Sequence, residues 1–206
     1  MFRDRHEAAS RLAEQLKEYQ GKNPLVLAIP RGAVPIAKLI AQRLDGEYDV
    51  VLVHKLGAPN QPELAIGSVD ESGWTYIADF AGAYGADHAY IEAEKQAQLE
   101  TIRQRRIQYT PVREPIDPRA RVVIVVDDGL ATGATMISAL HGLRARNPAK
   151  LVCAMPVSPP ETLRKIETMA DAVVCLHAPA FFQAVGQFYR DFPQLEDDEV
   201  IQLLKG

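Results

Sequence analysis

The sequence predicts an α/β protein with a mostly parallel sheet and helices on both faces. Residues 122–126 form an unbroken apolar, mostly β-branched run, which is typical of a central strand covered on both sides. Similar short apolar runs alternate with helical patterns along most of the chain. The 206 residues, 47% of them hydrophobic, suit one sizeable core, so we expect a single domain covering residues 1–206.

The first half of the chain is punctuated by glycine, proline and clusters of polar residues. In order, we expect a helix from about Asp4 to Tyr19 that ends at Gly21, a strand Leu25 to Ile29, a helix from about Val34 to Leu44, a strand Val50 to His54, and a hairpin of Glu63 to Val69 with Thr75 to Ala78. The segment 58–64 is polar and rich in proline, so it is a candidate cover for a site.

The second half begins with a long charged helix that Asp87 can cap and that runs to about Gln108. A connector with three prolines, Thr110 to Arg119, leads to the strand 122–126 and a helix. The remaining expected elements are a strand Leu151 to Met155, a helix opened by residues 158–161, a strand Ala172 to Leu176, and a short helix near Asp198 to Leu204.

Composition excludes several classes of function. The net charge of -4 argues against a nucleic-acid-binding surface, because such surfaces depend on many cationic contacts. Cys153 and Cys175 each lie in an apolar strand-like run, which favours buried thiols over a disulfide or a metal pair. No secretory segment and no membrane span is visible, so we expect a cytoplasmic protein.

Two acids and a glycine-bearing turn follow the strand 122–126. Asp127 and Asp128 fall at the carboxyl end of that strand, where open α/β sheets place their ligands. The turn Ala131, Thr132, Gly133, Ala134 and Thr135 then runs directly into a helix. Its backbone N–H groups and hydroxyls should converge at a positive helix end, which favours a phosphate group. The sequence therefore predicts a site for a phosphorylated sugar.

This motif resembles the diphosphate-sugar signature of the type I phosphoribosyltransferases, which bind 5-phosphoribosyl-1-pyrophosphate (PRPP). The resemblance implies a Rossmann-like sheet with a small hood, here contributed mainly by residues 178–206. It also implies that residues 131–135 hold the 5′-phosphate and that Asp127 and Asp128 hold the ribose hydroxyls. More narrowly, Ile29-Pro-Arg-Gly32, Lys55-Leu-Gly-Ala-Pro59 and Tyr189-Arg-Asp-Phe-Pro193 resemble a group of predicted bacterial phosphoribosyltransferases whose acceptor is not assigned.

Two further strand ends carry candidate residues for the pyrophosphate. Arg31 is a planar donor suited to phosphate oxygens and is followed by Gly32 and Ala33 at a predicted helix start. In the resembled family the matching loop holds pyrophosphate and often contains a strained cis peptide, which implies this role for residues 31–33. Lys55, at the next strand end, is a candidate catalytic residue that would meet the leaving group. His54 has no assigned role, and Glu63 either binds a metal or is simply solvated.

The aromatic tail is the candidate acceptor site. In the resembled family the residues after the last strand form a hood over the acceptor, which makes Phe181, Phe182 and Tyr189 candidates for acceptor contacts and Asp191 a candidate polar contact. A satellite hydrophobic cluster explains the phenylalanines equally well. The 6-oxopurine branch commonly has a lysine at the last strand, where this chain has Cys175, Leu176 and His177, and this departure weakens the case for a hypoxanthine or guanine acceptor.

The resemblance implies transfer of the 5-phosphoribosyl group from PRPP to a nitrogen acceptor, with a nucleobase and a role in nucleotide salvage as the expectation. Mg²⁺ should be held mainly by PRPP oxygens rather than by direct protein ligands. The competing class is a non-catalytic PRPP-binding regulatory protein; Arg31 and Lys55 argue for transfer because both address the leaving group. The mixed charges of the long helix indicate a solvated face or a subunit contact, and we expect a homo-oligomer without nucleic-acid partners.

Overall fold

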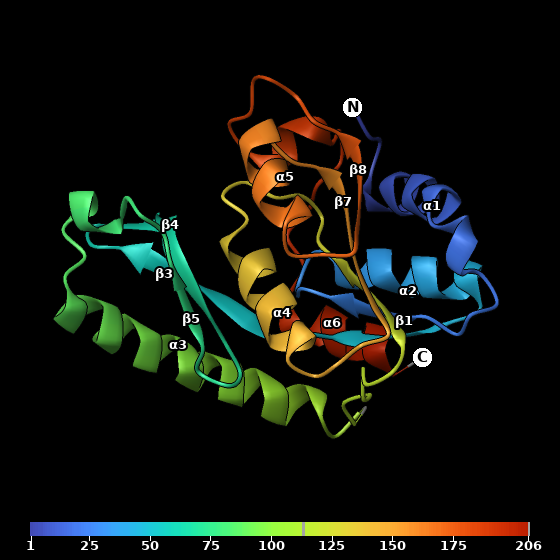
Figure 1. Ribbon diagram of the computed structural model, residues 1–206, viewed down its shortest axis with the longest axis horizontal. Coiled ribbons are helices and arrows are strands. Elements are labelled where there is room, and N and C mark those ends of the chain that lie inside the picture. The colour runs from blue at the N-terminus through green and yellow to red at the C-terminus, as the bar shows by residue number, and fades with distance from the viewer. Residues whose placement is uncertain (113, 206) are drawn as a thin grey trace.

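The computed structural model describes residues 1–112 and 114–205, and its centre is a five-stranded parallel sheet. The strand order is β2-β1-β6-β7-β8, and every neighbouring pair is parallel. The strands are β1 (Leu25–Ala28), β2 (Glu47–Val50), β6 (Val122–Val126), β7 (Lys150–Val157) and β8 (Ala172–His177). The predicted α/β fold with a mostly parallel sheet is therefore confirmed (Figure 1).

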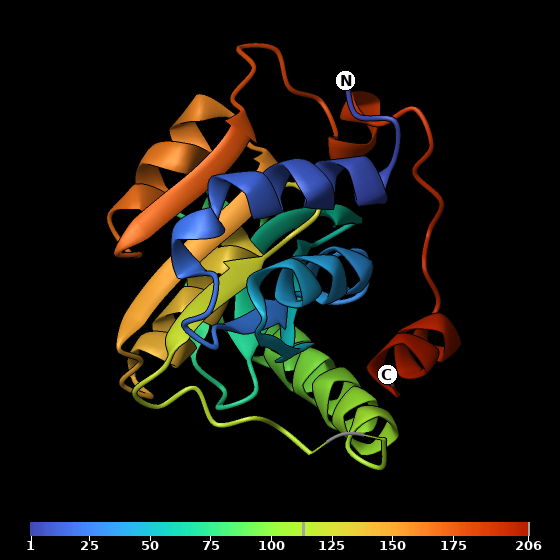
Figure 2. The same ribbon diagram turned by 90° about the vertical axis from the view of Figure 1, so that its right-hand side faces the viewer.

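Helices cover both faces of this sheet. Helices α1 (Arg5–Gln15) and α2 (Val34–Leu44) pack together on one face, while α4 (Ala134–Arg144) and α5 (Pro160–Glu167) lie on the other, as Figure 2 shows. The strand residues alternate between two hydrophobic clusters, with Ile124 and Val126 facing α1 and α2, and Val123 and Val125 facing α4. Because successive side chains point to opposite faces, an unbroken apolar strand fills two cores at once.

The predicted strand Val50 to His54 is wrong, because two strands of different sheets meet inside it. Val50 ends β2 and pairs with Ala28, whereas Val53 begins β3 and pairs with Asp70. The flanking residues Val50, Leu52 and Val53 are all buried. Hydrophobicity therefore continues across the point where the chain leaves one sheet for the other, and no turn residue marks the break.

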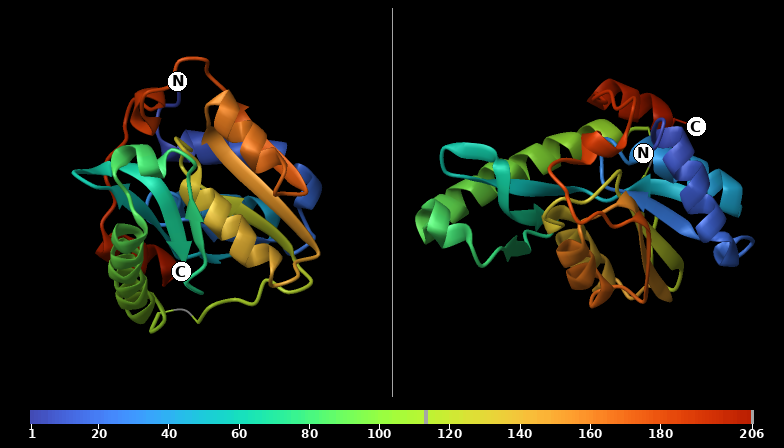
Figure 3. Two further views of the ribbon diagram at one scale, coloured as in Figure 1. Left: turned by 60° about the vertical axis from the view of Figure 1, so that its left-hand side comes forward. Right: turned by 90° about the horizontal axis from the view of Figure 1, so that it is seen from above.

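A smaller antiparallel sheet forms an arm beside the main sheet. It contains β3 (Val53–Ala58), β4 (Gln61–Asp70) and β5 (Thr75–Ile77), and the helix α3 (His88–Tyr109) runs along it, as Figures 1 and 3 show. The predicted hairpin is confirmed, but β4 begins earlier than expected. The predicted cover 58–64 therefore consists of the last residue of β3, a two-residue turn and the start of β4. Asp87 caps α3 as predicted, accepting a hydrogen bond from the Tyr90 backbone N–H at 2.8 Å.

The tail after β8 runs back along the amino-terminal end of the chain and finishes in α6 (Asp197–Leu204). The Phe2 backbone N–H donates to the Phe188 carbonyl at 2.7 Å, and the Arg190 N–H donates to the Phe2 carbonyl at 2.9 Å. Figure 2 shows this tail passing the start of α1 before it reaches α6. The amino-terminal end thus lies beside residues 188–190, whereas α6 packs against α2 and α3. Among residues 1–112 and 114–205, no helix is both long and apolar enough to cross a membrane.

Candidate functional site

The candidate residues gather where the direction of the sheet winding reverses. β1 leads through α2 to β2 on one side, while β6 leads through α4 to β7 on the other. β1 and β6 are neighbouring strands, and the helices that follow them run to opposite sides of the sheet. The carboxyl ends of these two strands therefore open into the crevice between the two connections. Ligands of open α/β sheets bind at such switch points. The structure thus brings Arg31 and the two acids to one edge of the sheet.

The loop 131–135, called here the Thr132 loop, is held open by Thr162 of α5. The Thr162 hydroxyl donates to the Ala131 carbonyl at 2.6 Å. Gly133 has a φ of +76°, and a Cβ added there would lie 2.7 Å from the Thr162 methyl carbon. Helix α4 begins at the next residue, so its first N–H groups border the cavity. This cavity of about 410 Å³ is lined by Lys55, Glu63, Leu64, Ala65, Asp127, Gln183 and residues 129–135.

Asp127 and Asp128 have different surroundings although they are adjacent. Asp127 lines the Thr132-loop cavity, and one of its carboxylate oxygens accepts the Asp128 backbone N–H at 2.8 Å. Burial and the Asp128 charge raise the pKa of Asp127 well above its ordinary value. Burial also raises the pKa of Asp128, and the Arg5 guanidinium opposes that rise. Carboxylates with raised pKa values at a strand end are candidates for function, because a cation or a hydrogen-bond donor would stabilise their ionised forms.

The Arg31 loop, residues 31–33, lies against Asp128. A Cβ added to Gly32 would lie 1.9 Å from the Asp128 Oδ2 atom, so only glycine lets the loop approach this closely. The Pro30-Arg31 peptide bond is cis. Arg31 donates a hydrogen bond to Glu196 at 3.0 Å, and Ala33 is buried at the start of α2. A second cavity of about 380 Å³ is lined by Arg5, Arg31, Gly32, Asp128, Phe192, Gln194 and Leu195.

Lys55 reaches the first cavity from β3 of the arm. Its ammonium lies 2.8 Å from the Glu63 carboxylate on the neighbouring strand. That ion pair lowers the pKa of Glu63, whose side chain is 93% exposed. The adjacent His54 is half-buried, and burial lowers its pKa. Glu63 is thus a solvent-exposed acid, as one of the two expected alternatives has it, and it also forms a surface ion pair with Lys55.

The predicted hood residues are dispersed along the tail. Tyr189 is only 5% exposed, and its hydroxyl donates to the Asp128 carbonyl at 2.7 Å. Phe182 stacks on Phe188 with ring centroids 5.3 Å apart, whereas Phe181 is 89% exposed. Asp191 is exposed and pairs with Arg190 at 2.9 Å. The tail thus contains the buried Tyr189, which contacts Asp128, and the exposed ring of Phe181.

Four residues that the sequence analysis did not single out complete the site. Arg5 and Phe192 border the second cavity, Gln183 borders the first, and Thr162 supports the Thr132 loop. Arg5 lies in an amphipathic helix, and Thr162 lies in the first turn of another, so their local patterns are those of ordinary surface and packing positions. Only the long-range packing of the helices reveals these contacts.

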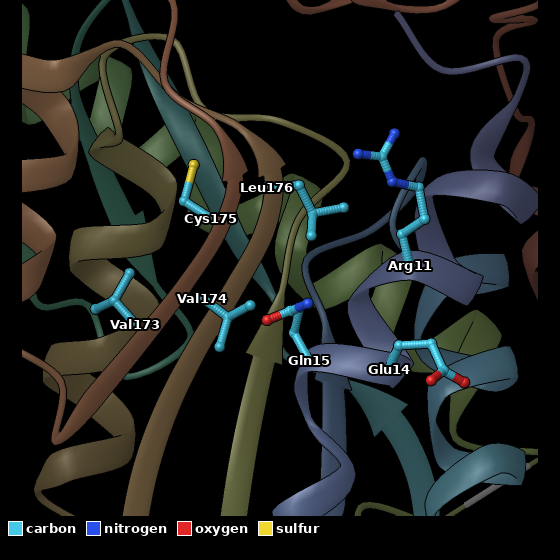
Figure 4. Close-up of a pocket in the computed structure, with 7 residues that line it drawn as sticks. All are labelled: Arg11, Glu14, Gln15, Val173, Val174, Cys175 and Leu176. Carbon is cyan, nitrogen blue, oxygen red and sulfur yellow. The ribbon is translucent and has the colours of Figure 1, made fainter.

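A third cavity, of about 540 Å³, lies away from this site between α1 and β8. Figure 4 shows its lining residues, which are Arg11, Glu14, Gln15 and residues 173–176. It faces the flank of the sheet rather than the strand ends, and none of the predicted site residues lines it. The strand-end cavities therefore remain the candidate functional site.

Comparisons with known proteins identify the family of this chain. The family model described as "Phosphoribosyl transferase domain" matches residues 3–193. Two curated proteins from Mycobacterium tuberculosis strains, each named "Putative phosphoribosyl transferase", are 41% identical over 206 residues. Those alignments cover 99% of this chain but 46% of each relative, so the chain spans about half the length of the curated relatives it matches.

Solved structures share the fold. The crystal structure of TT1426 from Thermus thermophilus matches with a TM-score of 0.82 and 42% identity, covering 99% of this chain and 97% of that one. A hypoxanthine phosphoribosyltransferase from Staphylococcus aureus matches with a TM-score of 0.50 and 19% identity, covering 86% and 75%. At that identity the likeness concerns the fold alone. Since the family model spans nearly the whole chain, including both acids and the Thr132 loop, this chain belongs to the phosphoribosyl transferase domain family.

Proposed function

We propose that this chain binds PRPP with Mg²⁺ and transfers the 5-phosphoribosyl group to a nitrogen acceptor, with release of pyrophosphate. A nucleobase is the proposed acceptor. The observation that carries the proposal is the convergence of Lys55, Asp127 and the Thr132 loop on one cavity at the switch point of the sheet. A helix start suited to phosphate, the acid Asp127 and the cation Lys55 line this cavity, while Asp128 and Arg31 line the second one. Together these groups match the three parts of PRPP.

In this proposal each part of PRPP has its own protein partners. The N–H groups of the Thr132 loop hold the 5′-phosphate at the positive end of α4. Asp127 and Asp128 accept hydrogen bonds from the ribose hydroxyls. Arg31, with the backbone of Gly32 and Ala33, and Lys55 hold the pyrophosphate. Breaking the C1–oxygen bond develops positive charge on the ribose and negative charge on the leaving group, so catalysis consists mainly of positioning and charge stabilisation.

The acids also fit the Mg²⁺ that the family generally uses with PRPP. Carboxylate oxygens are ligands that Mg²⁺ prefers, and the raised pKa values of the adjacent acids indicate that a nearby cation would stabilise both charges. Among residues 1–112 and 114–205, no group of three or more His, Cys, Asp or Glu side chains could hold a metal ion. Because Mg²⁺ usually keeps several waters and binds substrate phosphates, we assign most of the metal ligands to PRPP and water. When bound, Mg²⁺ would neutralise charge on the pyrophosphate oxygens.

The tail is the proposed hood over the acceptor. Phe181 is the exposed ring, and Phe182, Tyr189 and Asp191 lie on the same segment. Tyr189 already packs against two other rings, with centroids 5.5 Å from Phe2 and 4.6 Å from Phe192. An acceptor would therefore stack on Phe181 or Phe182 more readily than on Tyr189. Assembly into a homo-oligomer is likewise proposed.

Thermal unfolding tests the binding step before the acceptor is known. At about a hundred times its dissociation constant, PRPP with Mg²⁺ should stabilise the folded state by roughly 2.7 kcal/mol. Ribose 5-phosphate should stabilise the folded state less, because this ligand lacks the pyrophosphate. Removal of Mg²⁺ should weaken the binding of PRPP more than the binding of ribose 5-phosphate. An unchanged unfolding temperature in folded protein at saturating PRPP and Mg²⁺ would rule out both transfer and PRPP sensing.

Pyrophosphate release tests transfer itself. We would measure PRPP-dependent release with purine, pyrimidine and amine acceptors. Acceleration by one acceptor class supports transfer and identifies the substrate. Tight PRPP binding without release for any acceptor would instead favour the non-catalytic PRPP-binding regulatory protein.

A further inference from the structure

We propose that Arg5 of the first helix is a positioning residue that pairs with the charge of Asp128, orients this carboxylate toward the ribose and clamps the tail against the site. This inference rests on the proposed function, because it assigns Asp128 to PRPP. It adds a residue that lies outside both loops and outside the strand ends. Arg5 and Asp128 are 123 positions apart in the sequence.

The contact between Arg5 and Asp128 is bidentate at the arginine. The Arg5 Nε and Nη2 atoms donate to the same carboxylate oxygen, Asp128 Oδ2, at 3.0 and 2.9 Å. The two side chains are only 11% and 16% exposed, so water screens the pair weakly. Both hydrogen bonds end on Oδ2, so neither of them involves the other carboxylate oxygen, Oδ1. A planar guanidinium thus fixes the rotation of the carboxylate as well as its charge.

Gly32 shows that the sequence leaves space for this pair. A Cβ at position 32 would lie 1.9 Å from Asp128 Oδ2 and 3.1 Å from Arg5 Nη2. The first helix, the Arg31 loop and the strand end of β6 therefore meet at one carboxylate. A side chain larger than hydrogen at position 32 would displace the carboxylate or the guanidinium.

The same arginine holds the tail. Its Nη1 atom donates to the Pro193 carbonyl at 2.7 Å, and its guanidinium lies 3.9 Å from the centre of the Phe192 ring. The opposite end of this segment is anchored to the same acid, because the Tyr189 hydroxyl donates to the Asp128 carbonyl. Residues 189–193 are therefore tied to Asp128 both directly and through Arg5.

The surrounding charges explain why Asp128 needs a cation. Asp127 is its neighbour in the chain, Arg31 lines the same cavity, and the Tyr189 hydroxyl, whose pKa is raised by burial, contacts its backbone. Arg31 is already paired with Glu196. Among residues 1–112 and 114–205, Arg5 is thus the cation in direct contact with Asp128, and it opposes the rise in pKa that burial causes. Without it, the carboxyl would remain protonated to higher pH.

The test is the pH dependence of binding of PRPP with Mg²⁺ to the full chain, measured by calorimetry from about pH 5 to about pH 8.5. On the acidic side of the binding profile (its acidic limb), the pH at which binding is half lost should be higher in Arg5→Gln than in wild type. The expected rise is about one pH unit, the usual effect of losing one adjacent opposite charge. Arg5→Lys should restore most of that shift, because an ammonium keeps the charge beside Asp128. The protonation of PRPP and its binding of Mg²⁺ are the same in every sample. Differences between the pH profiles therefore come from the protein variants.

Arg11→Gln is the matched control, because it removes the same charge from the same helix at a residue that contacts Phe2 and Glu7 instead. It should leave the limb in place. Coincident limbs for wild type and Arg5→Gln, or equal shifts for Arg5→Gln and Arg11→Gln, would overturn the inference. Failure of Arg5→Lys to restore the limb in folded protein would show that Arg5 acts by shape alone, which also contradicts it.

A ligand-free measurement separates failure of this inference from failure of the proposed function. If wild type does not bind PRPP, the proposed function fails, and the pair is then tested through the unfolding temperature. The wild type should unfold at a higher temperature than Arg5→Gln at neutral pH, and the difference should shrink as pH falls and Asp128 becomes protonated. A difference independent of pH, or no difference, would contradict the role of Arg5 as the partner of an ionised Asp128.

Discussion

The Thr132 loop and the Arg31 loop are both proposed to bind phosphate groups, yet they are prepared for it in different ways. The Thr132 loop contains no charged residue and offers backbone N–H groups at the start of α4, with Thr162 holding its shape. The Arg31 loop relies on a guanidinium that Glu196 already engages, and Lys55 is likewise engaged by Glu63. The backbone N–H groups can bind phosphate as soon as the chain has folded. Arg31 and Lys55 must instead exchange a glutamate partner for the pyrophosphate.

The largest expected effect comes from closing the backbone site. Gly133→Val should abolish binding of both ribose 5-phosphate and PRPP, because the new side chain would meet the Thr162 methyl group and would sit at a positive φ. The strained backbone should also cost about 1–3 kcal/mol of stability. Calorimetry and thermal unfolding measure the two effects.

The matched control is Gly82→Val, since a Cβ at Gly82 has no atom within 4 Å. It should leave both ligands bound as in wild type. Retained ribose 5-phosphate binding in Gly133→Val would show that the 5′-phosphate binds elsewhere and would remove the basis of the comparison.

The next effect concerns the acids between the two loops. Asp127→Asn and Asp128→Asn should each lower the rate of transfer on the order of 100-fold, as expected for loss of one preorganised charged contact, while the fold remains intact. Pyrophosphate release measures the rate, and circular dichroism measures the fold. Turnover at the wild-type rate in both variants would exclude the acids from the reaction.

Asp127 also predicts how stability changes with pH. Its folded pKa is raised above the unfolded value of 3.8, so the folded state holds the proton more tightly. The stability of the ligand-free wild type relative to Asp127→Asn is therefore greatest at low pH and falls as pH rises from the unfolded pKa through the raised folded pKa. Urea unfolding of both proteins across this range measures the difference. A difference that grows with pH would have the wrong sign for a buried, repelled carboxyl.

A smaller, selective loss is expected at the Arg31 loop. Arg31→Ala should weaken pyrophosphate and PRPP binding by roughly 10- to 100-fold, the usual worth of hydrogen bonds to a charged group. Ribose 5-phosphate binding should change little, because that ligand lacks the diphosphate. Calorimetry with the three ligands measures the pattern, and equal losses for all three would contradict a specific pyrophosphate role.

The smallest effect sharpens the contrast between free and paired cations. Glu196→Gln and Glu63→Gln release Arg31 and Lys55 from exposed ion pairs, which are worth about 0.2–1 kcal/mol. Pyrophosphate affinity should therefore rise by up to about fivefold, with no change for ribose 5-phosphate. Weaker pyrophosphate binding in both variants would mean that the glutamates position the cations rather than compete for them.

Local pattern was informative wherever the chemistry lies in consecutive residues. The apolar run 122–126, the acids and the Thr132 loop were predicted in place because one strand, its end and one helix start encode them together. Prediction failed at residues 50–54, where two buried strands of different sheets follow each other without a polar break. The aromatic tail was predicted as a segment, but which rings are exposed depends on packing against Phe2 and Phe192.

By itself the sequence determined the fold class, the strand-end position of the two acids and the glycine-bearing turn that is proposed to bind phosphate, because hydrophobic period, turn chemistry and helix starts are local properties. Only the tertiary structure decided which groups face those acids. Arg5 reaches Asp128 because α1 packs across the sheet, and Glu196 reaches Arg31 because the tail returns past the same edge. Such pairings join positions far apart in the chain. No local pattern distinguishes Arg5 from a solvated surface residue, and none indicates that Glu196 pairs with Arg31.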